Sequence, residues 1–191
     1  MKNIAIFASG SGSNAENIIR YFKNHPSVKI DSVWSNKKEA YVLQRAQNLG
    51  VEARYFTRED FRGSDKMVKE LQLRKVDLIV LAGFLWLVPP EFVSSFNIIN
   101  IHPALLPAYG GKGMYGSIVH ESIIRNREKE SGITIHLVNN EFDKGEHLLQ
   151  VKCPVFPEDT AETLATRIHE LEYKYFPKAI EDYLNDAYSD H

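Results

Sequence analysis

The sequence has only one cysteine, Cys153, in 191 residues. No internal disulfide can form, and a metal site built from several cysteine ligands is excluded. No apolar run approaches the ~20 residues that a bilayer-spanning helix needs, and the run that begins at Ile4 is broken at Ser9, too early for a signal-peptide core. We therefore expect a cytoplasmic protein with no membrane segment and no leader.

An excess of charge of either sign is also missing. The chain carries 23 Lys and Arg against 25 Asp and Glu, a formal net charge of −2, whereas nucleic-acid binding usually needs a clustered basic face. Apolar residues make up 43% and charged residues 25%, close to the averages of soluble globular proteins. We expect no nucleic-acid partner, and a chain of this length without repeats or linkers predicts a single domain over residues 1–191.

Short apolar segments alternate with segments of helical periodicity along the chain. Strands are predicted over residues 2–8, 28–35, 52–56, 76–82 and 98–101, and helices over 14–25, 40–49, 58–75 with an early break at Gly63, and 89–96. A helix over 115–125, two strands over 133–138 and 147–155 joined by a turn, and a long helix over 160–184 complete the pattern. This alternation predicts an α/β fold: a Rossmann-like, mostly parallel sheet with helices on both faces and an antiparallel pair at one end.

A glycine-rich turn, Gly10 to Ala15, follows the first predicted strand and opens the first helix. Backbone N–H groups and the helix dipole favour a bound phosphate at such a position. The turn also fits a loose dinucleotide-binding pattern, but the second strand ends in Trp34-Ser35-Asn36 and lacks the acidic residue that this pattern expects. A monophosphate is therefore the favoured ligand, and a turn that only packs strand against helix is the alternative.

Asn100 and His102 lie two residues apart on a predicted strand and therefore share one face of it. An amide N–H and an imidazole N–H together can stabilise the oxyanion that forms when an acyl carbon becomes tetrahedral. A strand histidine by itself is more often structural, so the interpretation depends on the combination.

Asp143 precedes Gly145 in a predicted turn, and the turn alone would explain an aspartate there. His136 has the opposite parity to the apolar residues of its strand, so it can face a cleft or meet Asp143. A carboxylate near an imidazole raises the pKa of the imidazole. We expect Asp143 to act together with His102 and to favour its protonated form.

Four segments resemble the glycinamide ribonucleotide formyltransferase family, in the family's order and over almost the whole chain. They are Ser9-Gly10-Ser11-Gly12-Ser13-Asn14, Leu81-Ala82-Gly83-Phe84, Asn100-Ile101-His102-Pro103-Ala104-Leu105-Leu106-Pro107 and Glu141-Phe142-Asp143-Lys144-Gly145. The Asn-x-His-Pro segment and the Asp-containing loop are specific to folate-dependent formyl transfer. The serine-glycine loop narrows the resemblance to this family.

The resemblance implies roles for individual positions. Asn100, His102 and Asp143 match the family's catalytic residues. Gly12, Ser13 and Asn14 match the loop that holds the ribonucleotide phosphate, Glu172 is expected at the ribose, and His169 is a weaker match near the phosphate. Two segments match the backbone that lines the folate pterin pocket: Leu85, Trp86, Leu87 and Val88, and Asn140, Glu141 and Phe142 with Asp143.

The reaction implied by the resemblance is direct transfer of a formyl group from 10-formyltetrahydrofolate to the amine of glycinamide ribonucleotide, in purine synthesis, with no metal ion and no covalent intermediate. A monomer or homodimer is implied. The chain departs from some members at Trp86, where they carry Arg, and in the loop over residues 110–116. The first departure leaves open which residue holds the folate glutamate tail, with Arg62 as a candidate.

Three alternatives explain less of the sequence. Methionyl-tRNA formyltransferase is disfavoured because we recognise no second, basic RNA-binding domain. Formyltetrahydrofolate deformylase is disfavoured because we recognise no regulatory domain ahead of the catalytic one. A noncatalytic nucleotide-binding module would account for the fold and for Gly12, but not for Asn100, His102 and Asp143 together.

Overall fold

The computed structural model describes residues 1–187, and the chain divides into two compact units, Met1–Asn100 and Ile101–His191. Its strands are β1 (Lys2–Phe7), β2 (Val28–Ser35), β3 (Glu52–Tyr55), β4 (Val76–Leu81), β5 (Asn97–His102), β6 (Glu130–Leu137) and β7 (His147–Pro154). They follow the order β3-β2-β1-β4-β5-β6-β7 in one sheet. The pairs from β3 to β5 are parallel and β6 pairs antiparallel with β7, which confirms the predicted fold class. The single-domain organisation stays a prediction.

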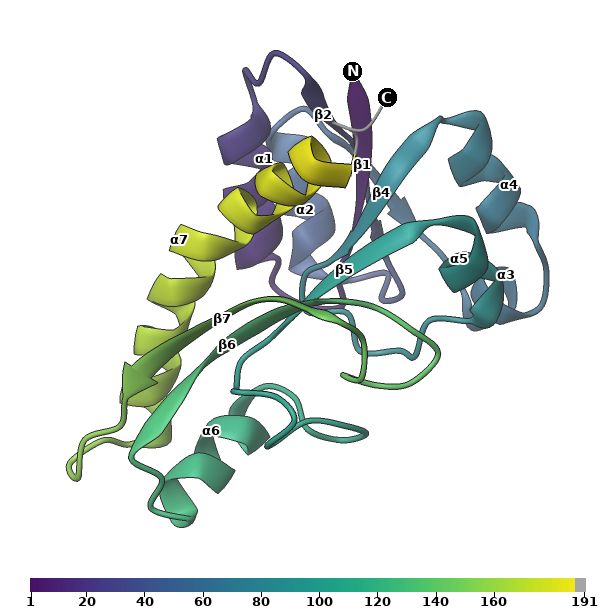
Figure 1. The fold of residues 1–191 in the computed structure, drawn as a ribbon. Helices are drawn as coiled ribbons and strands as arrows, with labels where there is room; N and C mark the ends of the chain where they lie inside the picture. Colours follow the sequence, from purple (N-terminus) through teal and green to yellow (C-terminus); the bar gives the residue numbers. More distant parts are fainter. Residues whose placement is uncertain (188–191) are drawn as a thin grey trace. The chain divides into compact units, whose positions relative to one another are not determined.

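The helices of the first unit are α1 (Ser13–Phe22), α2 (Tyr41–Asn48), α3 (Arg58–Arg62), α4 (Lys66–Leu73) and α5 (Pro90–Ser95). Figure 1 shows α1 and α2 grouped on one side of β1, and α3, α4 and α5 on the other. The strand order explains this grouping. The chain moves outward from β1 to β3 and then crosses back to β4, and right-handed crossovers place the later helices on the opposite face.

The central strands of the first unit are continuous apolar runs. Ile4 to Ala8 and Leu78 to Ala82 are all at most 5% exposed, as expected for parallel strands that helices cover on both faces. Because β1 and β4 are parallel neighbours, the loops that follow them leave from the same edge of the sheet. This edge carries the glycine-rich turn after β1.

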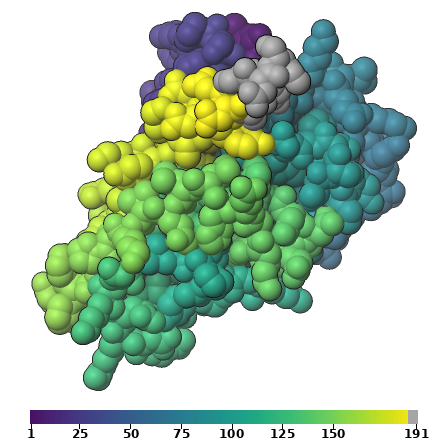
Figure 2. Space-filling view, in the orientation of Figure 1, coloured from purple at the N-terminus to yellow at the C-terminus, as the bar shows by residue number. Residues whose placement is uncertain are grey.

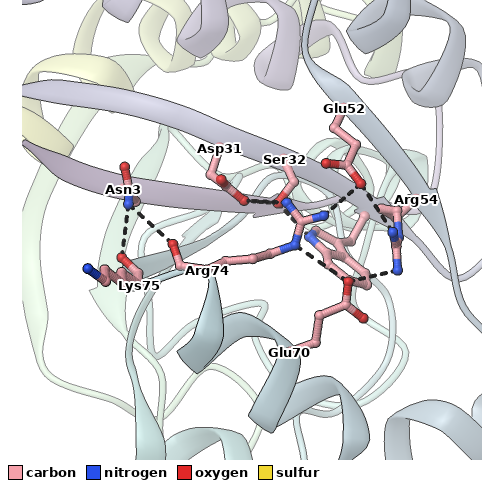
Figure 3. A network of polar contacts seen from close by, with 9 residues as sticks. Asn3, Asp31, Ser32, Glu52, Arg54, Glu70, Arg74 and Lys75 are labelled. Carbon is pink, nitrogen blue, oxygen red and sulfur yellow. Dashed lines mark hydrogen bonds and ion pairs between the residues drawn. The ribbon is translucent and has the colours of Figure 1, made fainter.

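A network of charged side chains lies near the opposite ends of the same strands (Figure 3). Arg74 pairs with Asp31 at 3.0 Å, with Glu52 at 2.6 Å and with Glu70 at 3.5 Å. The guanidinium also lies over the ring of Trp34, 5.9 Å from its centroid. Because Arg74 is largely buried and shares several carboxylates, the network fixes α4 against β2 and β3. It is a structural feature, remote from the loops that follow β1 and β4.

The second unit is built on the β6–β7 hairpin. Its helices are α6 (Ser117–Arg125) and α7 (Ala161–Ala187), and α7 packs on both strands and on α6. Figure 2 shows the yellow surface of α7 beside the green surface of β6 and β7. Leu164, Ile168 and Phe176 of α7 are fully buried. The long helix therefore completes the core of the second unit.

The segment over residues 58–75 forms two helices with the predicted break at Gly63, because Thr57 and Asp60 cap α3 reciprocally and Gly63 ends it. Two other element boundaries differ from the prediction for local reasons. Helix α6 begins at Ser117, because Gly116 before it has φ 57° and ψ −136°, which only glycine adopts readily. Strand β6 begins at Glu130, because a Cβ at Gly132 would lie 2.0 Å from Val151 O, so glycine lets β6 continue against β7.

Candidate active site

The glycine-rich turn has the geometry of an anion cradle. Gly12 is the N-cap of α1 with φ 77°, a left-handed conformation that favours glycine. The Gly12 carbonyl accepts the first helical hydrogen bond, from Glu16 N at 2.8 Å. The N–H groups of Ser13 and Asn14 belong to the first turn of α1, where the helix itself offers no acceptor. The structure thus places the three predicted phosphate-binding residues at a helix N-terminus, where an anion is favoured.

The predicted pterin segment of the first unit, Leu85 to Val88, follows β4. Its start is tied to the loop after β1, because Leu85 N donates to Ser9 Oγ at 3.0 Å. Arg62, the candidate for the glutamate tail, donates to Leu87 O at 2.6 Å and therefore lies against this segment. Arg58 lies over the ring of Trp86, 5.3 Å from its centroid. Two cations of α3 thus border the segment in which some family members carry their own Arg.

His102 ends β5 and is only 4% exposed. Its Nε2 lies 2.7 Å from the carbonyl oxygen of Tyr109, and because a carbonyl can only accept, Nε2 carries the proton of this hydrogen bond. Its Nδ1 lies 3.6 Å from Asp143 Oδ2, longer than a hydrogen bond. Asn100 lies two residues earlier on the same strand, so its side chain leaves the same face of β5.

Asp143 joins two histidines to the loop around residue 110. Its Oδ2 accepts a hydrogen bond from Gly111 N at 2.9 Å, and its Oδ1 lies 3.6 Å from His136 Nε2. The backbone of Asp143 has φ 56°, a left-handed conformation that Asp tolerates better than most residues. Gly145 is required in this turn, because a Cβ there would lie 1.6 Å from Leu137 O. The structure brings both His102 and His136 to Asp143, which for His136 is one of the two positions that its strand parity allowed.

Burial and charge act in opposite directions on this cluster. Burial lowers the pKa of His102, and the charge of Asp143 and the Tyr109 carbonyl oppose this effect without cancelling it. The net pKa of His102 is therefore below its ordinary value, which corrects the expectation that Asp143 holds the ring as a cation. Burial raises the pKa of Asp143, but the contacts with His136, His102 and Gly111 outweigh it, and the net pKa lies below the ordinary value. At neutral pH an ionised Asp143 thus lies beside a neutral His102.

The predicted residues of the loop before Asp143 lie at the surface of the second unit. Asn140 and Glu141 are exposed, and Phe142 is half-buried. Glu141 N donates to Asn139 Oδ1 at 2.9 Å, which forms a local turn. The loop therefore places exposed residues directly before the carboxylate of Asp143.

Glu172, the residue expected at the ribose, lies on α7 and is 5% exposed. Its Oε2 lies 3.0 Å from His169 Nδ1, and this hydrogen bond raises the pKa of His169. Sequence reasoning missed another buried histidine of this unit, His120 on α6, which is 5% exposed. Its place on the buried face of the helix beside Val119 and Ile123 was the available signal. No group of three or more His, Cys, Asp or Glu side chains within residues 1–187 is arranged to hold a metal ion.

Comparison with known proteins gives a consistent result. The model of the formyl transferase family matches residues 2–180. A phosphoribosylglycinamide formyltransferase of Haemophilus influenzae is 40% identical over 187 residues, covering 94% of this chain and 86% of the relative. A chloroplastic phosphoribosylglycinamide formyltransferase of Arabidopsis thaliana is 39% identical. The alignment covers 94% of this chain and 64% of the relative. The crystal structure of phosphoribosylglycinamide formyltransferase from Streptococcus pneumoniae is 34% identical with a TM-score of 0.84, covering 96% and 99% of the two chains.

The chain therefore belongs to the formyl transferase family, and the predicted fold and transferase class are confirmed. Within this family its relatives are the phosphoribosylglycinamide formyltransferases, enzymes of purine biosynthesis. Their reaction uses 10-formyltetrahydrofolate and glycinamide ribonucleotide, so the predicted function and co-substrate are confirmed as well. Within the described residues, no helix is long and apolar enough to cross a membrane.

Proposed function

We propose that this chain transfers a formyl group from 10-formyltetrahydrofolate to the amine of glycinamide ribonucleotide, with Asn100, His102 and Asp143 as the catalytic residues. The observation that carries the assignment is the arrangement at the end of β5. There a buried imidazole lies between a backbone carbonyl and an ionised carboxylate, two residues from an amide on the same strand face. A histidine with only a structural role would not require the carboxylate of Asp143 or the amide of Asn100 beside it.

The proposed mechanism is direct acyl transfer. The amine attacks the formyl carbon, and the Asn100 amide and the His102 Nε2–H donate to the oxygen that gains negative charge. In the free protein this N–H is donated to the Tyr109 carbonyl at 2.7 Å, so the formyl oxygen competes with that carbonyl for it. The tetrahedral intermediate collapses when the bond between the formyl carbon and N10 of the folate breaks, and the proton lost by the amine moves through water to N10, so that tetrahydrofolate leaves. The negative charge of Asp143 stabilises the positive charge that develops on His102 during this proton transfer.

Substrate binding is assigned to four sets of residues. We propose that Gly12, Ser13 and Asn14 bind the phosphate and that Glu172 binds the ribose. Leu85 to Val88 and Asn140 to Phe142 are proposed to contact the pterin. The N-terminal half would then serve mainly the nucleotide, and the C-terminal half the folate and the chemistry. The helix N-terminus at Gly12, the buried Glu172 and the exposed residues before Asp143 support these assignments.

We further propose that the enzyme works in the cytoplasm as a monomer or homodimer, without nucleic acid or membrane as a partner. The single cysteine and the balanced charge support this. Localisation of a tagged full-length chain tests the compartment, because a plant relative is chloroplastic. Light scattering of the purified chain tests the oligomeric state.

A spectrophotometric assay with 10-formyl-folate and glycinamide ribonucleotide tests the function. We expect deformylated folate to form only when the nucleotide is present, in a ratio of one to one with formylated nucleotide. Release of formate without the nucleotide would instead indicate a deformylase. Formylation of methionyl-tRNA would indicate the tRNA enzyme, and no turnover with any acceptor would favour a noncatalytic nucleotide-binding module.

Replacement of Gly12 by valine should weaken nucleotide binding by tenfold or more while folate affinity changes little. Any Cβ at Gly12 would lie 2.3 Å from Val42 Cγ2, and φ 77° is unfavourable for valine, so the cradle must deform. Isothermal titration with each substrate measures the two affinities. Gly50, with φ 73° and open space at its Cβ, provides a matched control as Gly50→Ala. Unchanged nucleotide affinity in a folded Gly12→Val protein would remove the phosphate assignment.

A further inference from the structure

Helix α2 holds the glycine-rich turn of the first unit through three contacts. Val42 N donates to Gly10 O at 3.2 Å, and Arg45 Nε donates to Ser11 O at 2.8 Å. The side chain of Val42 lies directly against Gly12, where no Cβ fits. Two successive carbonyls of the turn are thus directed at α2.

The direction of these carbonyls sets the direction of the following N–H groups. In a trans peptide the C=O of one residue and the N–H of the next point in opposite directions. When the Gly10 and Ser11 carbonyls point to α2, the N–H groups of Ser11 and Gly12 point away from it. These donors then face the same open side of the turn as an anion at the N-terminus of α1 would. The contacts to α2 therefore determine whether the turn presents donors or acceptors.

Arg45 is fixed for this positioning role. Its Nη1 pairs with Glu16 Oε2 on α1, and its guanidinium carbon lies 4.8 Å from the centroid of the Tyr41 ring. The side chain is 29% exposed, and Glu16 neutralises its charge. Because one donor of the guanidinium binds a carboxylate and another binds a backbone carbonyl, the group is held by the protein and is not directed at a ligand. Its effect on a phosphate would therefore act through Ser11.

We propose that Arg45 is a positioning residue for nucleotide binding: by holding the Ser11 carbonyl it turns the Ser11–Gly12 peptide so that the Gly12 N–H meets the substrate phosphate. The proposal rests on the assignment of the turn to the phosphate. It adds Arg45, a residue outside the turn, to the residues on which phosphate binding depends.

The test compares the ligand affinities of the Arg45→Met variant with those of Arg20→Met, which is the matched control. Arg20 pairs with the same Glu16, through Nη2 at 2.8 Å and Nε at 3.0 Å to Oε1, so it tests the loss of a Glu16 partner other than Arg45. For Arg45→Met we expect the dissociation constant of glycinamide ribonucleotide to rise about tenfold or more, while that of the unphosphorylated riboside, the folate affinity and kcat at saturation stay within about twofold. Arg20→Met should match the wild type in all four. Arg45→Lys should recover part of the affinity, because it keeps a charged donor.

Equal nucleotide affinity of the two Met variants, or an equal loss for phosphorylated and unphosphorylated ligands, would overturn the positioning role. If the wild type itself shows no preference for the phosphorylated ligand, the phosphate assignment fails first, so the two failures are distinguishable. If Arg45→Met does not fold, Arg45→Lys and Arg45→Gln carry the same comparison.

A separate observation concerns His120 in the second unit. This ring is 5% exposed, and its Nδ1 is buried with no hydrogen-bond partner among the residues that the structure describes. A buried nitrogen without a partner costs roughly 1 to 3 kcal/mol. An apolar side chain of similar size on α6 would avoid that cost. A histidine at this position is therefore explained best by a ligand that forms the missing hydrogen bond to Nδ1.

The groups around His120 indicate what that ligand is. Helix α6, which carries His120, packs on α7, which carries His169 and Glu172. Burial lowers the pKa of His120, and the carboxylate of Glu172 opposes this effect. His120 therefore lies on the helix that packs against the residues of this unit assigned to the ribose and the phosphate. A neutral imidazole can accept or donate at Nδ1 by changing tautomer, which suits a hydroxyl or an amine.

We infer that His120 is a further substrate-contacting residue, whose Nδ1 hydrogen-bonds to the nucleotide beside Glu172. This inference rests on the assignment of Glu172 to the ribose. His120→Leu should raise KM for the nucleotide by about tenfold or more, with a melting temperature equal to or above that of the wild type, because an unpaired polar atom is removed. His120→Asn should recover part of the affinity.

Ser131→Ala is the matched control. Its Oγ is also buried without a partner, but it lies on β6 and takes no part in the histidine cluster. The same stability effect with an unchanged KM is expected there. An unchanged KM in His120→Leu would overturn the inference. In the wild type, the nitrogen chemical shift of His120 Nδ1 should move on nucleotide addition and not on folate addition, and a shift that stays fixed would overturn it without any variant.

Discussion

Replacement of His102 by alanine should lower the turnover number by on the order of a hundredfold or more, with nucleotide and folate affinities within a few-fold of the wild type. This is the loss expected when one donor to a developing oxyanion is removed from a buried site. His102 is 4% exposed, so its N–H acts where water cannot substitute for it. Steady-state kinetics with both substrates separate turnover from binding.

Two further variants make the result interpretable. Because alanine leaves a cavity at a buried position, His102→Gln keeps an N–H donor and more of the volume, and it should retain more turnover than His102→Ala. His147→Ala removes an exposed histidine of β7 and should leave turnover unchanged. Wild-type turnover in a folded His102→Ala protein would remove His102 from the mechanism, whatever the affinities.

Much of the site could be predicted because its parts are local in sequence. Gly12 opens a helix directly after a strand, and Asn100 and His102 are two apart on one strand, so spacing alone gives their geometry. Strand parity placed His136 either in a cleft or beside Asp143, and the structure shows the second position. The mostly parallel sheet followed from the alternation of strands and helices, and the order of its strands became known only from the structure.

The remaining features depend on contacts between residues distant in sequence. Nothing local to Arg45 shows that its side chain reaches Ser11 O, 34 residues away. The lowered pKa of His102 reflects its burial, whereas the sequence displayed only the carboxylate that raises it. The Tyr109 carbonyl on His102 depends on a non-glycine residue with φ 56°, which no propensity predicts. Such contacts need the folded chain.

The pair formed by His102 and Asp143 gives the second large prediction. Asp143→Asn keeps the shape of the side chain but removes its negative charge, and turnover at neutral pH should fall by tenfold or more. The charge of Asp143 raises the pKa of His102 against the effect of burial. Without it, the pKa of His102 should fall further, so any limb of the pH–rate profile that reports protonation of His102 should move to lower pH.

The pH dependence of stability gives an independent check on Asp143→Asn. The folded pKa of Asp143 lies below its ordinary value of 3.8. The carboxylate therefore contributes stability above that value, and this contribution is lost as the pH falls through the lower folded pKa. Melting temperatures of the wild type should fall more steeply below pH 4 than those of Asp143→Asn. Parallel curves would show that the ionised carboxylate is not stabilised in the folded chain.

The double variant His102→Ala with Asp143→Asn decides whether the two residues act as one unit. If Asp143 acts by holding His102 and stabilising its charge, its removal should cost little once His102 is gone, and the combined loss should be smaller than the product of the two single losses. The 3.6 Å between His102 Nδ1 and Asp143 Oδ2 is within the range where such coupling is expected. The same cycle with His136→Gln in place of His102→Ala asks whether the coupling is specific, because His136 Nε2 lies at the same distance from the other oxygen of Asp143. Losses that multiply fully in the first cycle would show that Asp143 acts on the substrates independently of His102.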